Sequence, residues 1–330
     1  MNLIEKNSSI YVAGHNGMVG AAITRFLQKN SYDNLLLPNR KDLDLLDTIE
    51  VKNWFQKNKP EVVILAAAKV GGIEANKNYP GDFILENIKI QTNIIENSWK
   101  TGVKRFLFLG SSCIYPKLAK QPLKEEYLLT GQLEPTNEPY AIAKIAGIKL
   151  CSALKKQYGF DAISLMPTNL YGPGDNYNLS NSHVMPALIR KFYDAKYNNK
   201  SEVICWGSGA PKREFLYVDD FAEATIFILE NISSKSRSEH NFSLNLDSLI
   251  NVGTGLDISI KDLAEMIAKE LNYKGKIKWE TCRPDGTPRK LLDVSQLKKL
   301  GWQSKTSLKK GIKLTISNYE RELKNKSIRL

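Results

Sequence analysis

A strand, a turn with three glycines and a helix follow one another near the start of the chain. Residues 10–13 (Ile-Tyr-Val-Ala) are an apolar run, residues 14–20 hold the glycines, and residues 21–28 have helical apolar spacing. Glycines let a backbone approach a pyrophosphate closely, and a helix N-terminus offers N–H donors and the positive end of a dipole. This context predicts a dinucleotide site. Because the spacing is Gly-x-x-Gly-x-x-Gly rather than Gly-x-Gly-x-x-Gly, a tight structural turn is the alternative interpretation.

Apolar runs alternate with helical segments through the first half of the chain. Residues 62–68 and 106–110 are continuous apolar runs, which are typical of parallel strands buried on both faces. Segments at 82–101 and 140–158 have helical spacing, and a further strand is expected at 160–166. This alternation predicts an α/β fold with a doubly wound parallel sheet, whose ligands bind at the carboxyl ends of the strands.

The pattern changes near residue 170, where turns become more frequent and the alternation loosens. We predict a nucleotide-binding domain at residues 1–170 and a smaller C-terminal α/β domain for the substrate at residues 171–330. Segments near 215–231 and 248–254 are expected to return to the first domain. The lysine-rich end, residues 304–330, is expected to form a solvated helix.

Composition narrows the class of protein. The 330 residues are 42% hydrophobic and 25% charged, as in globular proteins, and their formal net charge is +12. This charge is spread along the chain without a nucleic-acid-reading module, so a small phosphate-bearing ligand is the preferred explanation. The chain's four cysteines lie far apart with no Cys-x-x-Cys, which argues against a zinc site or a disulfide scaffold. Without a signal-like or membrane-spanning apolar run, we expect a cytoplasmic protein with no metal, nucleic-acid or membrane partner.

One predicted helix carries a tyrosine and a lysine at a spacing that suits acid–base chemistry. Tyr140 and Lys144 follow Pro139, a residue type favoured in the first helical turn, and positions four apart share one helix face. A phenol alone has a pKa of about 10, and a neighbouring ammonium favours the phenolate and lowers that value. Such spacings also arise by chance in a chain with 14 tyrosines, so an exposed helix face is the alternative.

A short strand is also expected at residues 35–37 (Leu-Leu-Leu), and the residues after it bear on the choice of cofactor. An NAD site usually has an acidic residue here that holds the ribose 2′-hydroxyl. This chain offers Arg40 and Lys41, which instead favour a 2′-phosphate and therefore NADP(H). Asp42 follows directly, and a solvated basic loop is the alternative interpretation.

Seven short stretches match a known family over nearly the whole chain. They are residues 13–20 (AGHNGMVG), 66–73 (AAAKVGGI), 110–116 (GSSCIYP), 137–144 (NEPYAIAK), 167–173 (PTNLYGP), 213–220 (REFLYVDD) and 284–290 (PDGTPRK). Together they resemble the extended short-chain dehydrogenase/reductase family. The resemblance implies a Rossmann-type fold and an NADP(H)-dependent activity on a GDP-sugar: C3 and C5 epimerisation and C4 reduction of GDP-4-keto-6-deoxy-D-mannose, which gives GDP-L-fucose.

The resemblance also implies the catalytic groups. Ser111, Tyr140 and Lys144 match the family's reductase triad, in which Tyr140 would protonate the C4 oxygen as NADPH delivers hydride. Lys144 would hold the nicotinamide ribose and lower the tyrosine pKa, while Ser111 would orient the carbonyl. Cys113 and His183 match the acid–base pair for epimerisation, a pairing far more specific to this reaction than the glycine turn. By themselves, a lone cysteine is more often a small buried hydrophobe and a lone histidine more often structural.

Further residues are assigned to the ligands by their position in the matching stretches. The resemblance places the cofactor against Gly14, His15, Asn16, Gly17, Met18, Val19, Gly20, Arg40, Lys144, Pro167, Thr168, Asn169, Leu170 and His183. It places the GDP-sugar against Lys191, Trp206, Arg213 and Asp285, where cations suit the diphosphate and a carboxylate can accept from a guanine edge. Some family members carry an arginine for the 2′-phosphate where Asn16 stands. Here Arg40 is left to act largely alone, so we expect a weaker preference for NADPH.

Two other classes of protein share much of this pattern. A 4-epimerase or 4,6-dehydratase of nucleotide sugars keeps the tyrosine and lysine but not the pairing of Cys113 with His183. A non-catalytic NADP-sensing protein on the same fold usually loses the tyrosine or the lysine, and both are present here.

The assembly is predicted from two of the expected helices. Residues 82–101 and 140–158 carry more apolar residues than one buried face requires. Dimers of the resembling family commonly pair these two helices, and isologous dimers are the commonest oligomers. We therefore expect a homodimer.

Replacing Arg40 tests the predicted cofactor preference. If Arg40 grips the 2′-phosphate, Arg40→Ala should weaken NADPH binding by about one to two orders of magnitude and leave NADH binding nearly unchanged, since a charge-assisted hydrogen bond contributes about 1.5–3 kcal/mol. Titration of both cofactors into both proteins measures this. An equal loss for the two cofactors would make Arg40 structural and leave Lys41 as the candidate.

Overall fold

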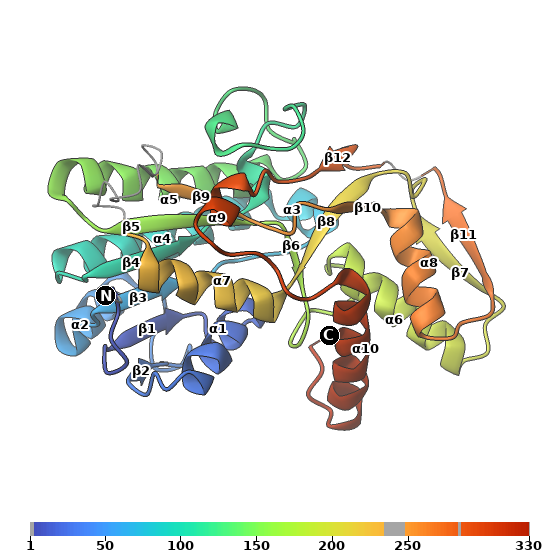
Figure 1. The fold of residues 1–330 in the computed structure, drawn as a ribbon, viewed down its shortest axis with the longest axis horizontal. Helices are drawn as coiled ribbons and strands as arrows, with labels where there is room; N and C mark the ends of the chain where they lie inside the picture. The colour runs from blue at the N-terminus through green and yellow to red at the C-terminus, as the bar shows by residue number, and fades with distance from the viewer. Residues whose placement is uncertain (1–2, 234–247, 283–284, 330) are drawn as a thin grey trace.

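The apolar runs of the sequence form the strands of one parallel sheet. The computed structural model describes residues 3–233, 248–282 and 285–329. The strands of this sheet are β1 (Ile10–Ala13), β2 (Leu35–Leu36), β3 (Val62–Leu65), β4 (Arg105–Leu109), β5 (Ala162–Pro167) and β9 (Leu249–Val252). They lie in the order β2-β1-β3-β4-β5-β9, and every neighbouring pair is parallel (Figure 1). The predicted doubly wound α/β fold is confirmed.

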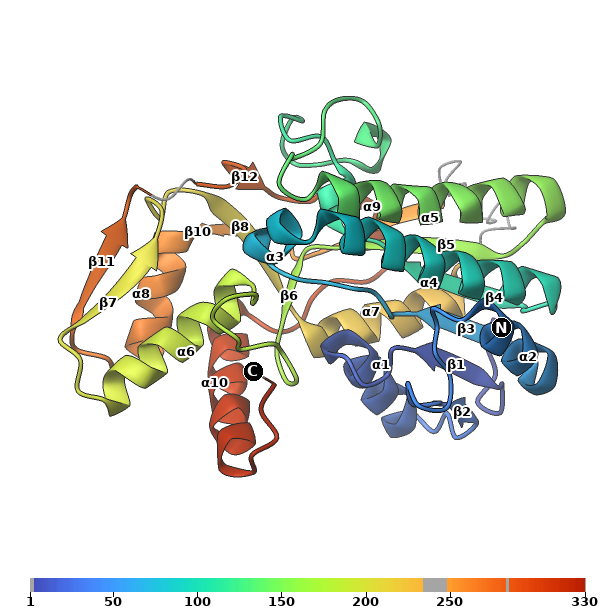
Figure 2. The same ribbon diagram turned by 180° about the vertical axis from the view of Figure 1, so that it is seen from behind.

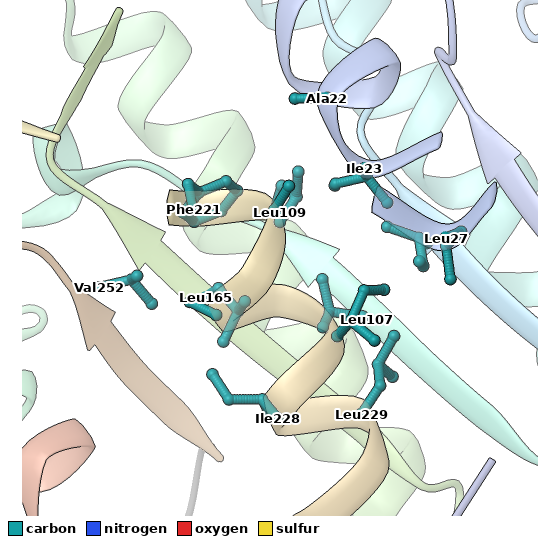
Figure 3. Close-up of a cluster of buried hydrophobic side chains, with 14 of the residues drawn as sticks. Ala22, Ile23, Leu27, Leu107, Leu109, Leu165, Phe221, Ile228, Leu229 and Val252 are labelled. Atoms are coloured by element: carbon teal, nitrogen blue, oxygen red, sulfur yellow. The ribbon is translucent and has the colours of Figure 1, made fainter. Parts of the chain in front are cut away.

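Helices cover both faces of the sheet. They are α1 (Met18–Lys29), α2 (Thr48–Asn58), α3 (Ile73–Asn78), α4 (Pro80–Lys100), α5 (Glu138–Tyr158), α7 (Val218–Asn231) and α9 (Ser295–Lys299), with 3-10 turns at Ser112–Ile114 and Glu125–Tyr127. α1 and α7 lie on one face, where Ile23, Leu165 and Phe221 belong to one apolar core (Figure 3). α2, α4 and α5 cover the other face, with Phe55 and Ile148 in a second core. Burial on both faces explains why β1, β3 and residues 106–109 of β4 are continuously apolar.

A smaller α/β part stands beside this sheet and has its own core (Figure 2). Its elements are β6 (Asn169–Tyr171), α6 (Val184–Tyr197), β7 (Glu202–Trp206), β8 (Lys212–Tyr217), β10 (Asp257–Ser259), α8 (Ile260–Glu270), β11 (Lys276–Glu280), β12 (Arg289–Lys290) and α10 (Leu308–Lys324). β6 continues from the end of β5 and pairs with β8, which also pairs with β10 and β12. The chain therefore passes into the smaller part at the carboxyl edge of the large sheet.

The return of residues 215–231 and 248–254 to the first domain stays a prediction, and the structure gives these segments the following neighbours. β9 pairs with β5, and α7 packs on the same face as α1. The division into two domains near residue 170 stays a prediction. The lysine-rich end differs from the expected solvated helix, because α10 buries Ile312 and Tyr319 in the core of the smaller part. None of the described helices has the length and apolarity needed to cross a membrane.

Candidate active site

The glycine turn forms a cradle at the point where the strand order reverses. Gly14 follows β1 with φ +87°, and a Cβ there would lie 2.7 Å from the Ala67 amide nitrogen at the end of β3. A Cβ on Gly20 would lie 2.2 Å from the Gly14 carbonyl oxygen, so α1 can pack this closely only with glycine. Among the described residues, no side chain caps the N-terminus of α1, which begins after Gly17 without an acidic residue in its first turn. The free N–H groups and this switch point fit the diphosphate of a dinucleotide.

The other predicted residues of the glycine turn lie next to Gly14 or in the first turn of α1. His15 and Asn16 follow Gly14 in the turn, while Met18 and Val19 begin α1 and pack against the core on that face. The Asn16 side-chain amide donates to Asn39 Oδ1 at 3.1 Å and so joins the glycine turn to the loop after β2.

The loop after β2 offers a cation to the same region. Arg40 and Lys41 are both exposed there. Asp42 accepts a hydrogen bond from the Asn39 amide at 3.2 Å, so its carboxylate serves the loop itself. The Asp42 carboxylate is therefore less available as the acidic ribose ligand of an NAD site.

The segment Pro167–Leu170 lies at the carboxyl end of β5. Hydrogen bonds to β8, a strand of the smaller part, fix its position. The Thr168 hydroxyl and the Asn169 amide both donate to the Glu214 carbonyl oxygen, at 3.1 and 2.8 Å. Leu170 packs against the core shared with α1. The segment is therefore fixed beside the glycine cradle, as a nicotinamide pocket requires.

A serine and a cysteine lie together where β4 ends. Ser111 is the N-cap of the 3-10 turn Ser112–Ile114, and its Oγ accepts a hydrogen bond from the Cys113 amide at 3.4 Å. The Cys113 side chain is buried. Burial raises the pKa of the Cys113 thiol, against the opposing effects of the Lys290 cation, the Ser111 hydrogen bond and the Lys144 cation.

Tyr140 and Lys144 reach the same place from the first turns of α5. Lys144 is buried, and its ammonium donates to the Leu109 carbonyl oxygen at 2.8 Å and lies 5.8 Å from the centre of the Tyr140 ring. Burial lowers the pKa of Lys144 to about 8, against a smaller effect of Cys113.

The expected lowering of the tyrosine pKa is not seen. Burial, followed by the nearby Cys113, raises the pKa of Tyr140, and the hydrogen bond with Ser111 only partly opposes them. Desolvation of the phenolate therefore outweighs the neighbouring charge. A phenol with a raised pKa keeps its proton at neutral pH and suits the role of an acid.

His183 enters the site from the smaller part of the molecule. It is the N-cap residue of α6, and the loop before it is attached to the turn after β3 by a hydrogen bond from the Gly72 amide to the Asn181 carbonyl oxygen at 2.9 Å. The residue keeps exposed surface, yet the pKa of its imidazole is lowered by burial and then by the Lys290 cation. Lys290 acts on both Cys113 and His183, so the structure brings the two into one electrostatic environment.

The four residues expected to hold the GDP-sugar form two groups farther along the smaller part. Lys191 Nζ lies 4.8 Å from the centre of the Trp206 ring and donates to the Ile204 carbonyl oxygen at 3.0 Å. Asp285 accepts two hydrogen bonds from Ser208, at 3.0 Å from its amide and 2.6 Å from its hydroxyl.

Arg213 interacts electrostatically with Asp285 of the second group. Burial lowers the pKa of the Arg213 guanidinium, against the opposing effects of Asp285 and Glu134. Cations such as Arg213 and Lys191 suit a diphosphate.

Two charged residues in the site were not singled out from the sequence. Lys290, at the end of β12, has a pKa that burial lowers. Glu134 precedes α5 and contacts Lys117 and Thr287. Lys290 is the last residue of the matching stretch 284–290, and this position is the feature of the sequence that could have indicated it. Nothing in the local spacing points to Glu134, because its partners are brought to it by the fold.

The chain matches known proteins along most of its length. Residues 10–244 match the model of a family described as the NAD dependent epimerase/dehydratase family. A GDP-L-fucose synthase from Escherichia coli K12 is 53% identical over 306 residues, 93% of this chain and 94% of that protein. A GDP-6-OMe-4-keto-L-xylo-heptose reductase from C. jejuni has a similar structure, with a TM-score of 0.90, 38% identity and coverage of 97% of this chain and 99% of that one. A GDP-L-fucose synthetase from Naegleria fowleri bound to NADP has a TM-score of 0.86, 27% identity and coverage of 99% and 98%.

The influence of Lys290 can be measured on His183 directly. We expect His183 to titrate below the usual 6.5 or so of a free histidine and to move upward in Lys290→Met, because removing the cation removes one of the two effects that disfavour the imidazolium. Imidazole proton shifts in NMR report this, and the chain has three histidines, so His183→Gln identifies the signal. An unchanged titration in Lys290→Met would show that burial alone sets the value.

Proposed function

Because the chain belongs to the NAD dependent epimerase/dehydratase family, we propose that it converts GDP-4-keto-6-deoxy-D-mannose to GDP-L-fucose, by epimerisation at C3 and C5 and NADPH-dependent reduction at C4. The observation that supports the proposal is that Cys113 is hydrogen-bonded to Ser111 and that Lys290 acts electrostatically on both Cys113 and His183. One arrangement can therefore serve both a reduction and an exchange of protons at carbon.

Reduction uses the groups around Tyr140. Bound NADPH supplies the hydride, and the glycine cradle, the 167–170 segment and Arg40 are the groups that would hold it. Tyr140 donates its proton to the C4 oxygen, and the Ser111 hydroxyl orients that oxygen by a hydrogen bond. Lys144 is mainly protonated at neutral pH, since its pKa is lowered only to about 8. Its charge favours the tyrosinate that remains after proton donation.

Epimerisation uses the same polarised ketone. C3 and C5 both flank C4, so breaking a C–H bond at either carbon sends its electron pair toward the C4 oxygen, which Tyr140 and Ser111 stabilise. Inversion requires a proton to leave one face and another to arrive on the opposite face. The raised pKa of Cys113 and the lowered pKa of His183 leave a thiol, which holds a proton, and a neutral imidazole, which holds a lone pair. The pair thus provides one acid and one base.

The remaining assignments are binding roles. Lys191 and Arg213 suit the diphosphate of the GDP-sugar, Trp206 offers an aromatic face, and Asp285 can accept hydrogen bonds from a guanine edge. All four cysteines are unpaired, which supports the expected cytoplasmic location.

Two substitutions separate the two chemistries. Cys113→Ser is nearly isosteric and should bind NADPH normally but lose proton exchange at carbon, since a hydroxyl is a far weaker acid than a thiol with its pKa of about 8.5. Tyr140→Phe should behave in the opposite way, with little reduction and continued exchange. NMR of the keto-sugar in D₂O, with each variant and without turnover to the alcohol, follows deuterium at C3 and C5. Undiminished uptake at both carbons with Cys113→Ser would remove Cys113 from the mechanism.

A homodimer is the assembly we propose. α4 and α5 lie side by side on the outside of the sheet (Figure 2) and expose apolar side chains, among them Leu85, 56% exposed, and Ile142, 41% exposed. Pairing these helices across a two-fold axis would bury both positions. Light scattering at micromolar concentration should give twice the chain mass for the wild type and a lower mass for Leu85→Glu/Ile142→Glu. A monomeric wild type would refute the proposal.

A further inference from the structure

Glu134 joins three segments of the chain through one carboxylate. Its Oε2 lies 3.0 Å from Lys117 Nζ and accepts a hydrogen bond from the Thr287 hydroxyl at 3.4 Å. Its Oε1 accepts from the Thr136 amide at 3.5 Å and from the Thr136 hydroxyl at 3.4 Å. The Glu134 side chain is only 16% exposed. A partly buried carboxylate with this many donors is held in one position.

Each of these three segments leads to a residue of the proposed chemistry. Lys117 follows the turn that carries Cys113, Thr136 precedes the helix that carries Tyr140, and Thr287 precedes Lys290 on the way into β12. Thr136 is a neighbour of Glu134 in the sequence, whereas Thr287 lies 153 residues away, and here Glu134 is the common contact between the three segments.

Glu134 is also the negative charge among the site's cations. Although burial opposes the shift, the hydrogen bonds from Lys117, Thr136 and Thr287 lower the pKa of Glu134, so it is an anion at neutral pH. Its charge favours the protonated forms of both Lys290 and Arg213.

Glu134 and Cys113 border the same small cavity of about 10 Å³, together with Lys117, Thr287 and Lys290. A space of that size admits about one water molecule and no sugar. The contacts of the Glu134 carboxylate are with Lys117, Thr136 and Thr287, so we assign it a role through these neighbours.

We propose that Glu134 is a positioning residue for epimerisation, which anchors the segment of Lys290 to the turn of Cys113 and holds the Lys290 ammonium beside Cys113 and His183. This inference rests on the proposed epimerase–reductase function. It assigns Glu134 to the proton exchange at carbon and not to the binding of NADPH, whose cradle lies on other elements.

The expected pH dependence follows from the groups that face each partner. Cys113, Arg213 and Glu134 act on Lys290, while Lys290, Ser111 and Lys144 act on Cys113. Without Glu134, Lys290 loses its proton at a lower pH, and its charge no longer lowers the pKa of His183. His183 then keeps its proton to a higher pH, so exchange that needs the neutral imidazole should begin at a higher pH.

Glu134→Gln keeps the size of the side chain and removes its charge. We expect deuterium uptake at C3 and C5 in D₂O to slow by about tenfold and its pH profile to move to higher pH, with NADPH affinity and thermal stability unchanged. Glu126→Gln is the matched control, because Glu126 lies in the same connection between β4 and α5 and its side chain is 70% exposed. Glu134→Asp should recover part of the rate, because it restores the carboxylate.

A second variant keeps the test decisive if Glu134→Gln folds poorly. Thr287→Val removes one hydroxyl contact to Glu134 and should slow uptake in the same direction by a smaller factor. Uptake with an unshifted pH profile in whichever variant folds would overturn the inference, as would an equal loss in Glu126→Gln. If the wild type itself shows no uptake, the proposed function fails, and the two failures are thus distinguishable.

Discussion

The buried carboxylate of Glu214 is the interaction on which the joining of the two parts of this molecule depends. It lies on β8 with no exposed surface, and burial raises its pKa. Its oxygens accept hydrogen bonds from the amides of Thr254 and Gly255, at 2.6 and 2.7 Å, and from the amide of Leu292 at 2.9 Å. An ionised group can be buried only when such donors replace its lost hydration. Glu214 therefore fixes the chain after β9 and before α9 against β8.

The same residue connects this junction to the candidate site. Its carbonyl oxygen accepts hydrogen bonds from the side chains of Thr168 and Asn169, in the segment beside the glycine cradle. Its neighbour Arg213 is one of the residues proposed to bind the GDP-sugar. The proposed cofactor segment and a proposed sugar contact are thus positioned by consecutive residues of one strand, which suits a reaction that must bring a nicotinamide and a sugar ring into contact.

Burial also determines which protons the site holds. Tyr140 and Cys113 have raised pKa values and remain protonated, whereas Lys144, Lys290 and His183 have lowered ones. Desolvation by burial is the largest cause of the pKa shift in each of these five residues. Nearby charges then modify the effect of burial: Lys290 opposes it at Cys113 and adds to it at His183. An acid that holds its proton and a base that is free of one can therefore coexist a short distance apart at one pH.

The sequence by itself determined the features that depend on neighbours along the chain. The apolar runs predicted β1, β3 and β4, and the glycine spacing predicted the turn at Gly14, because the periods of strands and the conformations of glycine are local properties. Only the tertiary structure decided the direction of the Tyr140 pKa and the contacts of Glu134. The buried face of α10 was settled in the same way, against the expectation of a solvated helix. Desolvation and long-range contacts depend on which distant segments pack together, and no local pattern of residues contains that information.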